Sequence, residues 1–112
     1  MPDTTWKQAE RRVCALFGGR RRGPDGVGQS DCADTEQAIQ VKRSKRGTPE
    51  GRWIADARRH GKNEKKPWIL VVIKPGQHVE NAVAVVSLDY LTSVLGERDA
   101  LLLVLRESNQ LR

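Results

Sequence analysis

Apolar positions spaced three, four and seven residues apart predict the helices of this chain. Trp6, Val13 and Phe17 fall on one stripe, which predicts a helix over roughly residues 4–17. Thr48 as a cap, followed by Pro49 at the first helical position, favours a second helix. That helix is expected over residues 48–60, ended by Gly61. A third is expected over residues 88–95, capped by Ser87 and ended by Gly96. A fourth is expected over residues 99–108, although its apolar run also allows a strand.

Strands are predicted where the apolar pattern is continuous or alternates. The unbroken run of residues 68–73 is typical of a strand buried on both faces, and residues 82–86 form the next candidate. Two shorter segments, 30–33 and 37–43, would form a hairpin turned by residues 34–36. The expected class is therefore α/β, a mixed β-sheet flanked by helices.

Composition limits the chain to one domain with a charged partner. The 112 residues carry a formal charge of +6, which favours a polyanion such as nucleic acid. The longest apolar stretch, residues 101–105, is too short to span a bilayer, so no membrane partner is expected. Cys14 and Cys32 form no CxxC pair, and two buried thiols in a reducing cytoplasm are expected rather than a zinc site or disulfide framework.

Residues 18–29 form the one long loop-like segment and hold five of the ten glycines. Glycine and proline prevent a helix there, and a loop of this length inside a small domain is often functional. Its consecutive basic residues, Arg20, Arg21 and Arg22, are candidates for phosphate contact, together with Arg43, Lys45 and Arg46 beyond the second strand.

Polar residues interrupt two of these apolar patterns. Glu10 lies within the stripe of the first helix, where a buried carboxylate needs an arginine partner, such as Arg20 or a neighbour, or a metal ion. On the strand after the hairpin turn, Gln40 and Lys42 share the face opposite the apolar residues. This is either an ordinary polar strand face or part of a site, and Asp31 would lie opposite Gln40 across the hairpin.

Glu10, Asp31 and the segment Gln40-Val41-Lys42 together resemble the active-site pattern of the PD-(D/E)xK nuclease superfamily. The similarity is to its small Holliday-junction-resolvase-like branch, which includes phage-type members, and it covers roughly residues 5–91. Two features depart from the pattern: glutamine replaces the usual glutamate at position 40, and Asp25 in the literal Pro-Asp pair is an alternative to Asp31.

The resemblance implies a restriction-endonuclease-like core and hydrolysis of DNA phosphodiester bonds. Glu10, Asp31, Gln40 and the Val41 carbonyl would hold Mg²⁺ or Mn²⁺, because such ions take oxygen ligands. Lys42 would orient the attacking water or stabilise charge on the phosphate. Branched DNA is a candidate substrate for this cytoplasmic enzyme of bacterial, archaeal or phage origin. The alternatives are an inactive nucleic-acid-binding domain of the same fold and an unrelated basic RNA-binding protein.

Two further expectations concern surfaces. The C-terminal segment 97–112 has more apolar residues than one helix face needs, which predicts a homodimer contact or, alternatively, a buried terminal helix. His60 and His78 are isolated in the sequence, and both are expected at the surface.

Overall fold

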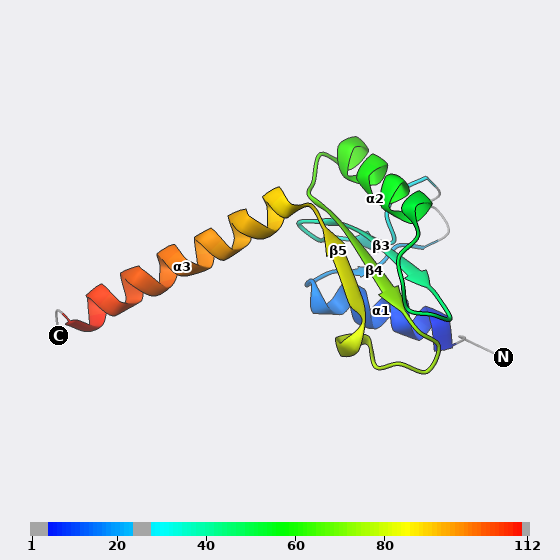
Figure 1. Ribbon diagram of the computed structural model, residues 1–112, viewed down its shortest axis with the longest axis horizontal. Helices are drawn as coiled ribbons and strands as arrows, with labels where there is room; N and C mark the ends of the chain where they lie inside the picture. The colour runs from blue at the N-terminus through cyan, green and yellow to red at the C-terminus, as the bar shows by residue number, and fades with distance from the viewer. Residues whose placement is uncertain (1–4, 24–27, 111–112) are drawn as a thin grey trace.

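The computed structural model describes residues 5–23 and 28–110, which form three helices, five strands and a short 3-10 helix (Figure 1). In chain order these elements are α1 (Thr5–Leu16), β1 (Arg20–Arg21), β2 (Cys32–Ala33), β3 (Ala38–Arg43), α2 (Gly51–Glu64), β4 (Trp68–Ile73), η2 (Val79–Asn81), β5 (Val83–Val86) and α3 (Leu88–Gln110).

The central sheet has the strand order β3-β4-β5, with β3 parallel to β4 and β4 antiparallel to β5. Helices α1 and α2 cover its opposite faces (Figure 1). The predicted α/β class, with a mixed sheet flanked by helices, is therefore confirmed.

Strand β4 is buried on both faces because successive side chains point to opposite sides of a sheet. Val71 packs in one cluster with Val13 of α1, whereas Leu70 packs in another with Ala57 of α2. The register pairs Val41 with Val71 and Gln40 with Leu70. The apolar side chains of β3 therefore face α1, and its polar side chains lie on the face that α2 covers.

The predicted hairpin between residues 30–33 and 37–43 is wrong in its pairing. Strand β2 pairs antiparallel with β1, whose two residues lie inside the segment expected to be a loop. Asp34 has a left-handed backbone, with φ of 62°, and turns the chain between β2 and β3. One contact between the two predicted strands is present, because the Asp31 amide donates to the Ile39 carbonyl at 2.8 Å.

Cys14 and Cys32 form a disulfide, so the expectation of two thiols is wrong. The bond joins α1 to β2, and both cysteines are fully buried. Their separation of 18 residues matches no motif, since the pairing depends on how α1 packs beside β2. The disulfide fixes α1, which carries Glu10, to β2, which directly follows Asp31.

Helix α2 begins two residues after Pro49, the predicted first helical residue, and Glu50 is at its N-cap. The helix continues through Gly61 to Glu64. The prediction that Gly61 ends the helix is wrong. A side chain at this position would place its Cβ 2.9 Å from the Lys66 carbonyl and 3.0 Å from Cβ of Trp68. Glycine is therefore present for close packing against the following chain.

Helix α3 is continuous, so the predicted break at Gly96 is also wrong. An internal glycine costs a helix only about 1 kcal/mol relative to alanine, and good helix formers surround it. The predicted cap is confirmed, because the Ser87 hydroxyl accepts from the Tyr90 amide at 3.1 Å. Beyond its first turn α3 projects from the body (Figure 1), and residues 101–105 are each at least 43% exposed. A buried terminal helix is thereby excluded.

Gly19 provides a test of the β1–β2 contact. A Cβ at Gly19 would lie 2.2 Å from the Ala33 carbonyl oxygen and 2.5 Å from Cγ2 of Thr35. We expect Gly19→Ala to lower the free energy of unfolding by roughly 1–3 kcal/mol, the usual cost of overpacking. Gly23→Ala, which adds a Cβ in open space, is the matched control. Urea unfolding of both variants measures the difference, and equal stabilities would contradict this close packing.

Candidate functional site

A cleft of about 500 Å³ opens at the outer edge of β3. Its walls come from the first turns of α1, the chain before β2, and β3 itself: Trp6, Glu10, Asp31, Gln40, Val41, Lys42 and Arg43. All four residues predicted to be catalytic line this one cleft, although they lie on three separate segments of the chain.

Asp31 is held against β3 by two hydrogen bonds. Its amide donates to the Ile39 carbonyl, and its Oδ2 accepts from the Val41 amide at 2.7 Å. These bonds flank Gln40, so the predicted position of Asp31 opposite that residue is confirmed. In a strand the amide and carbonyl of one residue point to the same edge. The Val41 carbonyl is therefore directed toward the edge where Asp31 lies.

Burial raises the pKa of Asp31 above its ordinary value. The Val41 hydrogen bond and the positive charges of Lys42 and His60 oppose this rise, whereas the nearby negative charge of Glu10 adds to it. A second carboxylate in a partly desolvated cleft disfavours the ionised form of Asp31. A bound cation would relieve that repulsion.

Glu10 is 9% exposed and forms an ion pair with Arg21, whose Nε donates to Oε2 at 3.1 Å. The alternative that a neighbouring arginine neutralises Glu10 is therefore confirmed. The contact does not use the whole carboxylate, which has two oxygens and about four acceptor sites. Glu10 therefore retains capacity to bind a cation at the cleft.

Gln40 lines the cleft, and its side-chain oxygen lacks a partner. Its Oε1 is fully buried and accepts no hydrogen bond from the residues that the structure describes. An unsatisfied buried acceptor costs about 1–3 kcal/mol, so it calls for an explanation. Lys42 follows two residues later on the same face of β3 and is half-exposed.

The donors in the cleft fit a hard divalent cation. Among residues 5–23 and 28–110, no three His, Cys, Asp or Glu side chains are grouped so that they could hold a metal ion. A site here therefore needs amide or main-chain oxygens beside Asp31 and Glu10. The unpartnered Oε1 of Gln40 meets that need, and Mg²⁺ and Mn²⁺ accept such mixed oxygen ligands.

The three loop arginines each face a carboxylate of this chain. Arg20 pairs with Asp34, Arg21 with Glu10, and Arg22 with Glu64. Arg22 also donates to two main-chain carbonyls, those of residues 30 and 32, so it is part of the loop's own structure. The predicted DNA contacts of these arginines would compete with internal ion pairs.

The other three predicted DNA-binding residues lie at and beyond the end of β3. Arg43, Lys45 and Arg46 are exposed, and Arg43 lines the cleft. Asp25, the alternative to Asp31, lies outside the described residues. Asp31, by contrast, lies in the cleft and is bonded to the main chain of β3.

Two residues near the cleft were not assigned a role from the sequence. His60 is buried, so its predicted surface position is wrong; its Nδ1 has no partner within the described chain. His60 follows Ala57 by three residues on the buried face of α2, and this helical spacing is the sequence signal that predicts its burial. Trp6, on the apolar stripe of α1, is half-buried against the core and also forms a wall of the cleft. His78 is exposed, as predicted.

The raised pKa of Asp31 leads to a stability prediction. The folded state holds this proton more tightly than the unfolded chain, so stability falls as the pH rises from about 4, the unfolded value, through the folded value. Asp31→Asn removes the ionisation yet keeps an oxygen that can accept from Val41. In EDTA its melting temperature should exceed that of wild type by a few degrees at pH 7, and the excess should shrink below pH 4.

Thermal unfolding followed by circular dichroism across this pH range measures the difference. Glu36→Gln is the control, because Glu36 is an exposed acid on the same stretch of chain. A lower melting temperature for Asp31→Asn at pH 7 would show that the ionised carboxylate stabilises the fold instead.

Among the described residues, no helix has the length and apolar character needed to cross a membrane. Comparisons with protein-family models, with curated proteins and with solved structures give no match for this chain. The function of the protein is therefore inferred from the geometry and chemistry of the cleft.

Proposed function

We propose that this protein is a metal-dependent DNA endonuclease of the PD-(D/E)xK type with a restriction-endonuclease-like core. The observation that carries the proposal is the unpartnered Oε1 of Gln40, a residue that lines the same cleft as Asp31, Glu10 and Lys42. The oxygen is fully buried without a partner, and the same residue lines the cleft together with two carboxylates. A cation bound between them would use that oxygen as a further ligand.

Each residue then has a distinct task. Asp31, Glu10, Gln40 and the Val41 carbonyl would hold Mg²⁺ or Mn²⁺, which would neutralise charge on a phosphodiester and make water a better nucleophile. Asp31 keeps its position through the Val41 and Ile39 main chain. The compact ammonium of Lys42 would orient water or stabilise negative charge as it develops on the phosphate oxygens.

Substrate binding would depend on Arg43, Lys45 and Arg46. These exposed cations extend from the cleft along the chain after β3 and can contact phosphates without displacing an internal carboxylate. Phosphate contacts release counterions, so binding should weaken steeply with salt and read little base sequence. This arrangement favours recognition of DNA shape, with branched DNA as a candidate.

The test is cleavage of labelled single-stranded, duplex, flap and four-way-junction DNA in Mg²⁺, Mn²⁺ or EDTA. We expect cutting in either metal, none in EDTA, and none by Asp31→Asn, which should bind the same DNA. Cleavage that persists in EDTA, or in Asp31→Asn, would overturn the assignment of the cleft.

The second candidate is a DNA-binding domain of the same fold without activity. It is favoured by the neutral amide at Gln40 and by the Arg21 contact to Glu10, since both reduce the negative charge available to a cation. Salt-sensitive binding without cleavage in either metal would support this candidate. Gln40→Glu, which restores the charge usual in the family, would then be expected to recover cutting.

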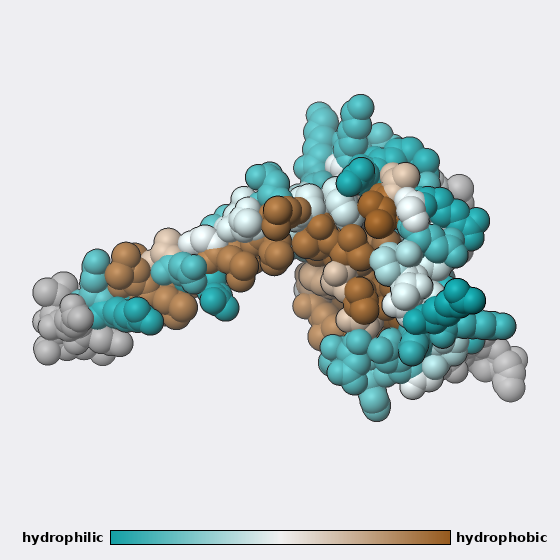
Figure 2. Space-filling view, in the orientation of Figure 1, coloured by the Kyte–Doolittle hydropathy of each residue, from teal (hydrophilic) through white to brown (hydrophobic). Residues whose placement is uncertain are grey.

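We also propose that α3 mediates a homodimer. Its apolar side chains are exposed on several sides, and Figure 2 shows a hydrophobic surface that runs along α3 and continues onto the body beside its base. Val83 on β5 is 46% exposed in the body. A second copy can cover both regions reciprocally, because a two-fold interface uses the same surface on each subunit.

Sedimentation equilibrium tests this contact. Leu95 and Leu102 lie seven residues apart on α3, and both are exposed, so Leu95→Glu with Leu102→Glu should give a monomer without loss of fold. Leu16→Glu, at a still more exposed leucine of α1, should remain dimeric. A wild-type chain that is monomeric at micromolar concentration would contradict the proposal.

A further inference from the structure

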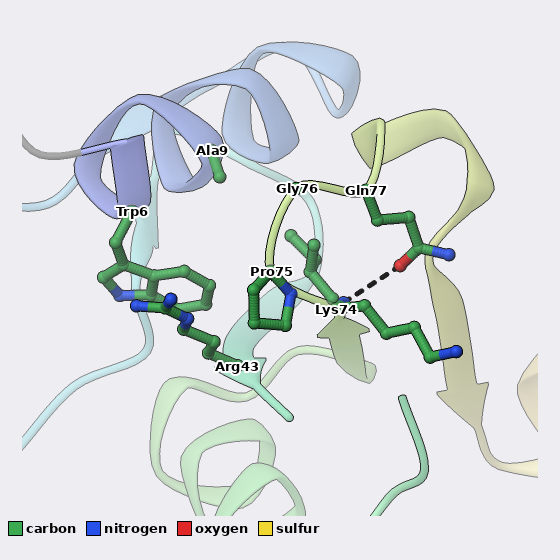
Figure 3. Close-up of a pocket in the computed structure, with 8 residues that line it drawn as sticks. Trp6, Ala9, Arg43, Lys74, Pro75, Gly76 and Gln77 are labelled. Atoms are coloured by element: carbon green, nitrogen blue, oxygen red, sulfur yellow. Dashed lines mark hydrogen bonds between the residues drawn. The ribbon is translucent and has the colours of Figure 1, made fainter. Parts of the chain in front are cut away.

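A second pocket, of about 320 Å³, lies beside the candidate cleft and shares two residues with it. Trp6 and Arg43 line both cavities. The remaining walls come from the end of β4 and the turn that follows, including Ile73, Lys74 and Pro75 (Figure 3). A ligand that extends past the C-terminal end of β3 would therefore occupy both cavities together.

The pocket combines an aromatic face, apolar walls and cationic residues. In Figure 3 the Trp6 indole and the Arg43 side chain lie together at one side, with Pro75 next to them. Ala9 and Ile73 add apolar lining. The described residues place no carboxylate in this lining, so nothing there repels an anion.

The turn is built to keep this pocket open. The Gln77 side chain accepts from the Lys74 amide at 3.0 Å, and the Gln77 amide donates to the Lys74 carbonyl at 3.1 Å (Figure 3). Gly76 has φ of +77°, a left-handed conformation that glycine adopts without strain. These contacts hold Pro75 and Lys74 at the pocket with no ligand needed to order them.

We propose that the pocket receives one unpaired nucleobase of the DNA, next to the phosphodiester that lies in the cleft. The base would stack on Trp6 between apolar walls, while Arg43 and Lys74 contact the adjoining phosphates. A base inside a duplex cannot enter without leaving its stack. The substrate class is therefore DNA with unpaired nucleotides, either single-stranded or at a branch, a statement that rests on the proposed function.

The test measures binding in EDTA, so that no cleavage is involved. Fluorescence anisotropy with a labelled single-stranded oligonucleotide and its duplex compares wild type with Trp6→Ala and Trp6→Phe. Loss of one stacked base should weaken single-strand binding roughly 10-fold in Trp6→Ala and leave duplex binding within 2-fold. Trp6→Phe, which keeps an aromatic face, should recover most of the affinity.

An abasic site moved through the oligonucleotide identifies the base concerned. One position should reduce wild-type affinity as much as Trp6→Ala does, and the same lesion should have no further effect in that variant. Lys45→Gln is the control, because Lys45 lies outside the pocket and should weaken single-strand and duplex binding alike. Arg43→Gln provides a second pocket variant, which should weaken single-strand binding more than duplex binding, should Trp6→Ala fail to fold.

Equal effects of Trp6→Ala on both DNA forms, or an abasic scan without a sensitive position, would overturn the pocket assignment. The result is separable from the cleavage test. A protein that cleaves but shows no sensitive position retains the proposed function and loses this subsite. A protein that shows the sensitive position but never cleaves retains the subsite and loses the nuclease assignment.

Discussion

Replacing Lys42 with alanine should lower the single-turnover rate of DNA cleavage by roughly 10²–10³-fold, the usual loss when one charge-stabilising donor is removed. Lys42 lies two residues after Gln40 on the same face of β3 and lines the cleft with Asp31. Its ammonium is therefore placed to act on the phosphate or water that the cleft holds. DNA binding in EDTA should change little, because one phosphate contact at most is lost.

Two variants separate this role from general charge. Lys45→Ala removes an exposed cation three residues later and should alter the salt dependence of binding with only a small effect on the cleavage rate. Lys42→Arg keeps the charge but replaces a compact ammonium with a planar fork, so it should remain impaired. Full activity of Lys42→Ala would remove Lys42 from the mechanism.

Removing the disulfide should have the largest effect on stability. A cross-link that closes a loop of this size, with a sequence separation of 18 between Cys14 and Cys32, contributes about 3 kcal/mol by constraining the unfolded chain. In a domain of this length the melting temperature should fall by roughly 10–20 °C. The double variant Cys14→Ala with Cys32→Ala, and wild type fully reduced, should both show this shift.

The same change should also reduce activity below the melting temperature. Cys14 follows Glu10 by one helical turn, and Cys32 directly follows Asp31, so the bond ties together the two segments that bear the carboxylates. A reducing agent should have no effect on the double variant, which serves as the control. Thiol titration must show that wild type is reduced; an unchanged melting temperature would then contradict the prediction.

Local patterns were sufficient to predict α1, β3 and β4, although not the pairing of the strand next to Asp31. Alternation within β3 places Gln40 and Lys42 on one face, and the interrupted stripe of α1 marks Glu10 as a buried acid. The run that forms β4 has no polar residue to direct it toward water. These features depend on side-chain periodicity within one element, so they can be derived without knowledge of the fold.

Features that depend on contacts between distant segments could not be predicted. The Cys14–Cys32 bond and the Arg22–Glu64 pair each join different elements, the second across 42 residues. The sequence pattern predicts a helix end at Gly61, whereas this glycine lets α2 pack closely against residues 66 and 68. Only the position of that neighbouring chain reveals this role. The apolar excess of α3 was evident, but its projection from the body depends on tertiary structure.

Binding of Mn²⁺, measured by electron paramagnetic resonance, tests the central claim most directly. Wild type should bind the ion, and Asp31→Asn should weaken binding at least 10-fold, since it loses a charged ligand. Gln40→Leu has a similar volume and removes the side-chain amide, the unpartnered oxygen included, so it should weaken binding while the fold remains intact. Equal Mn²⁺ binding by wild type and both variants, or none by wild type, would contradict a metal site in this cleft.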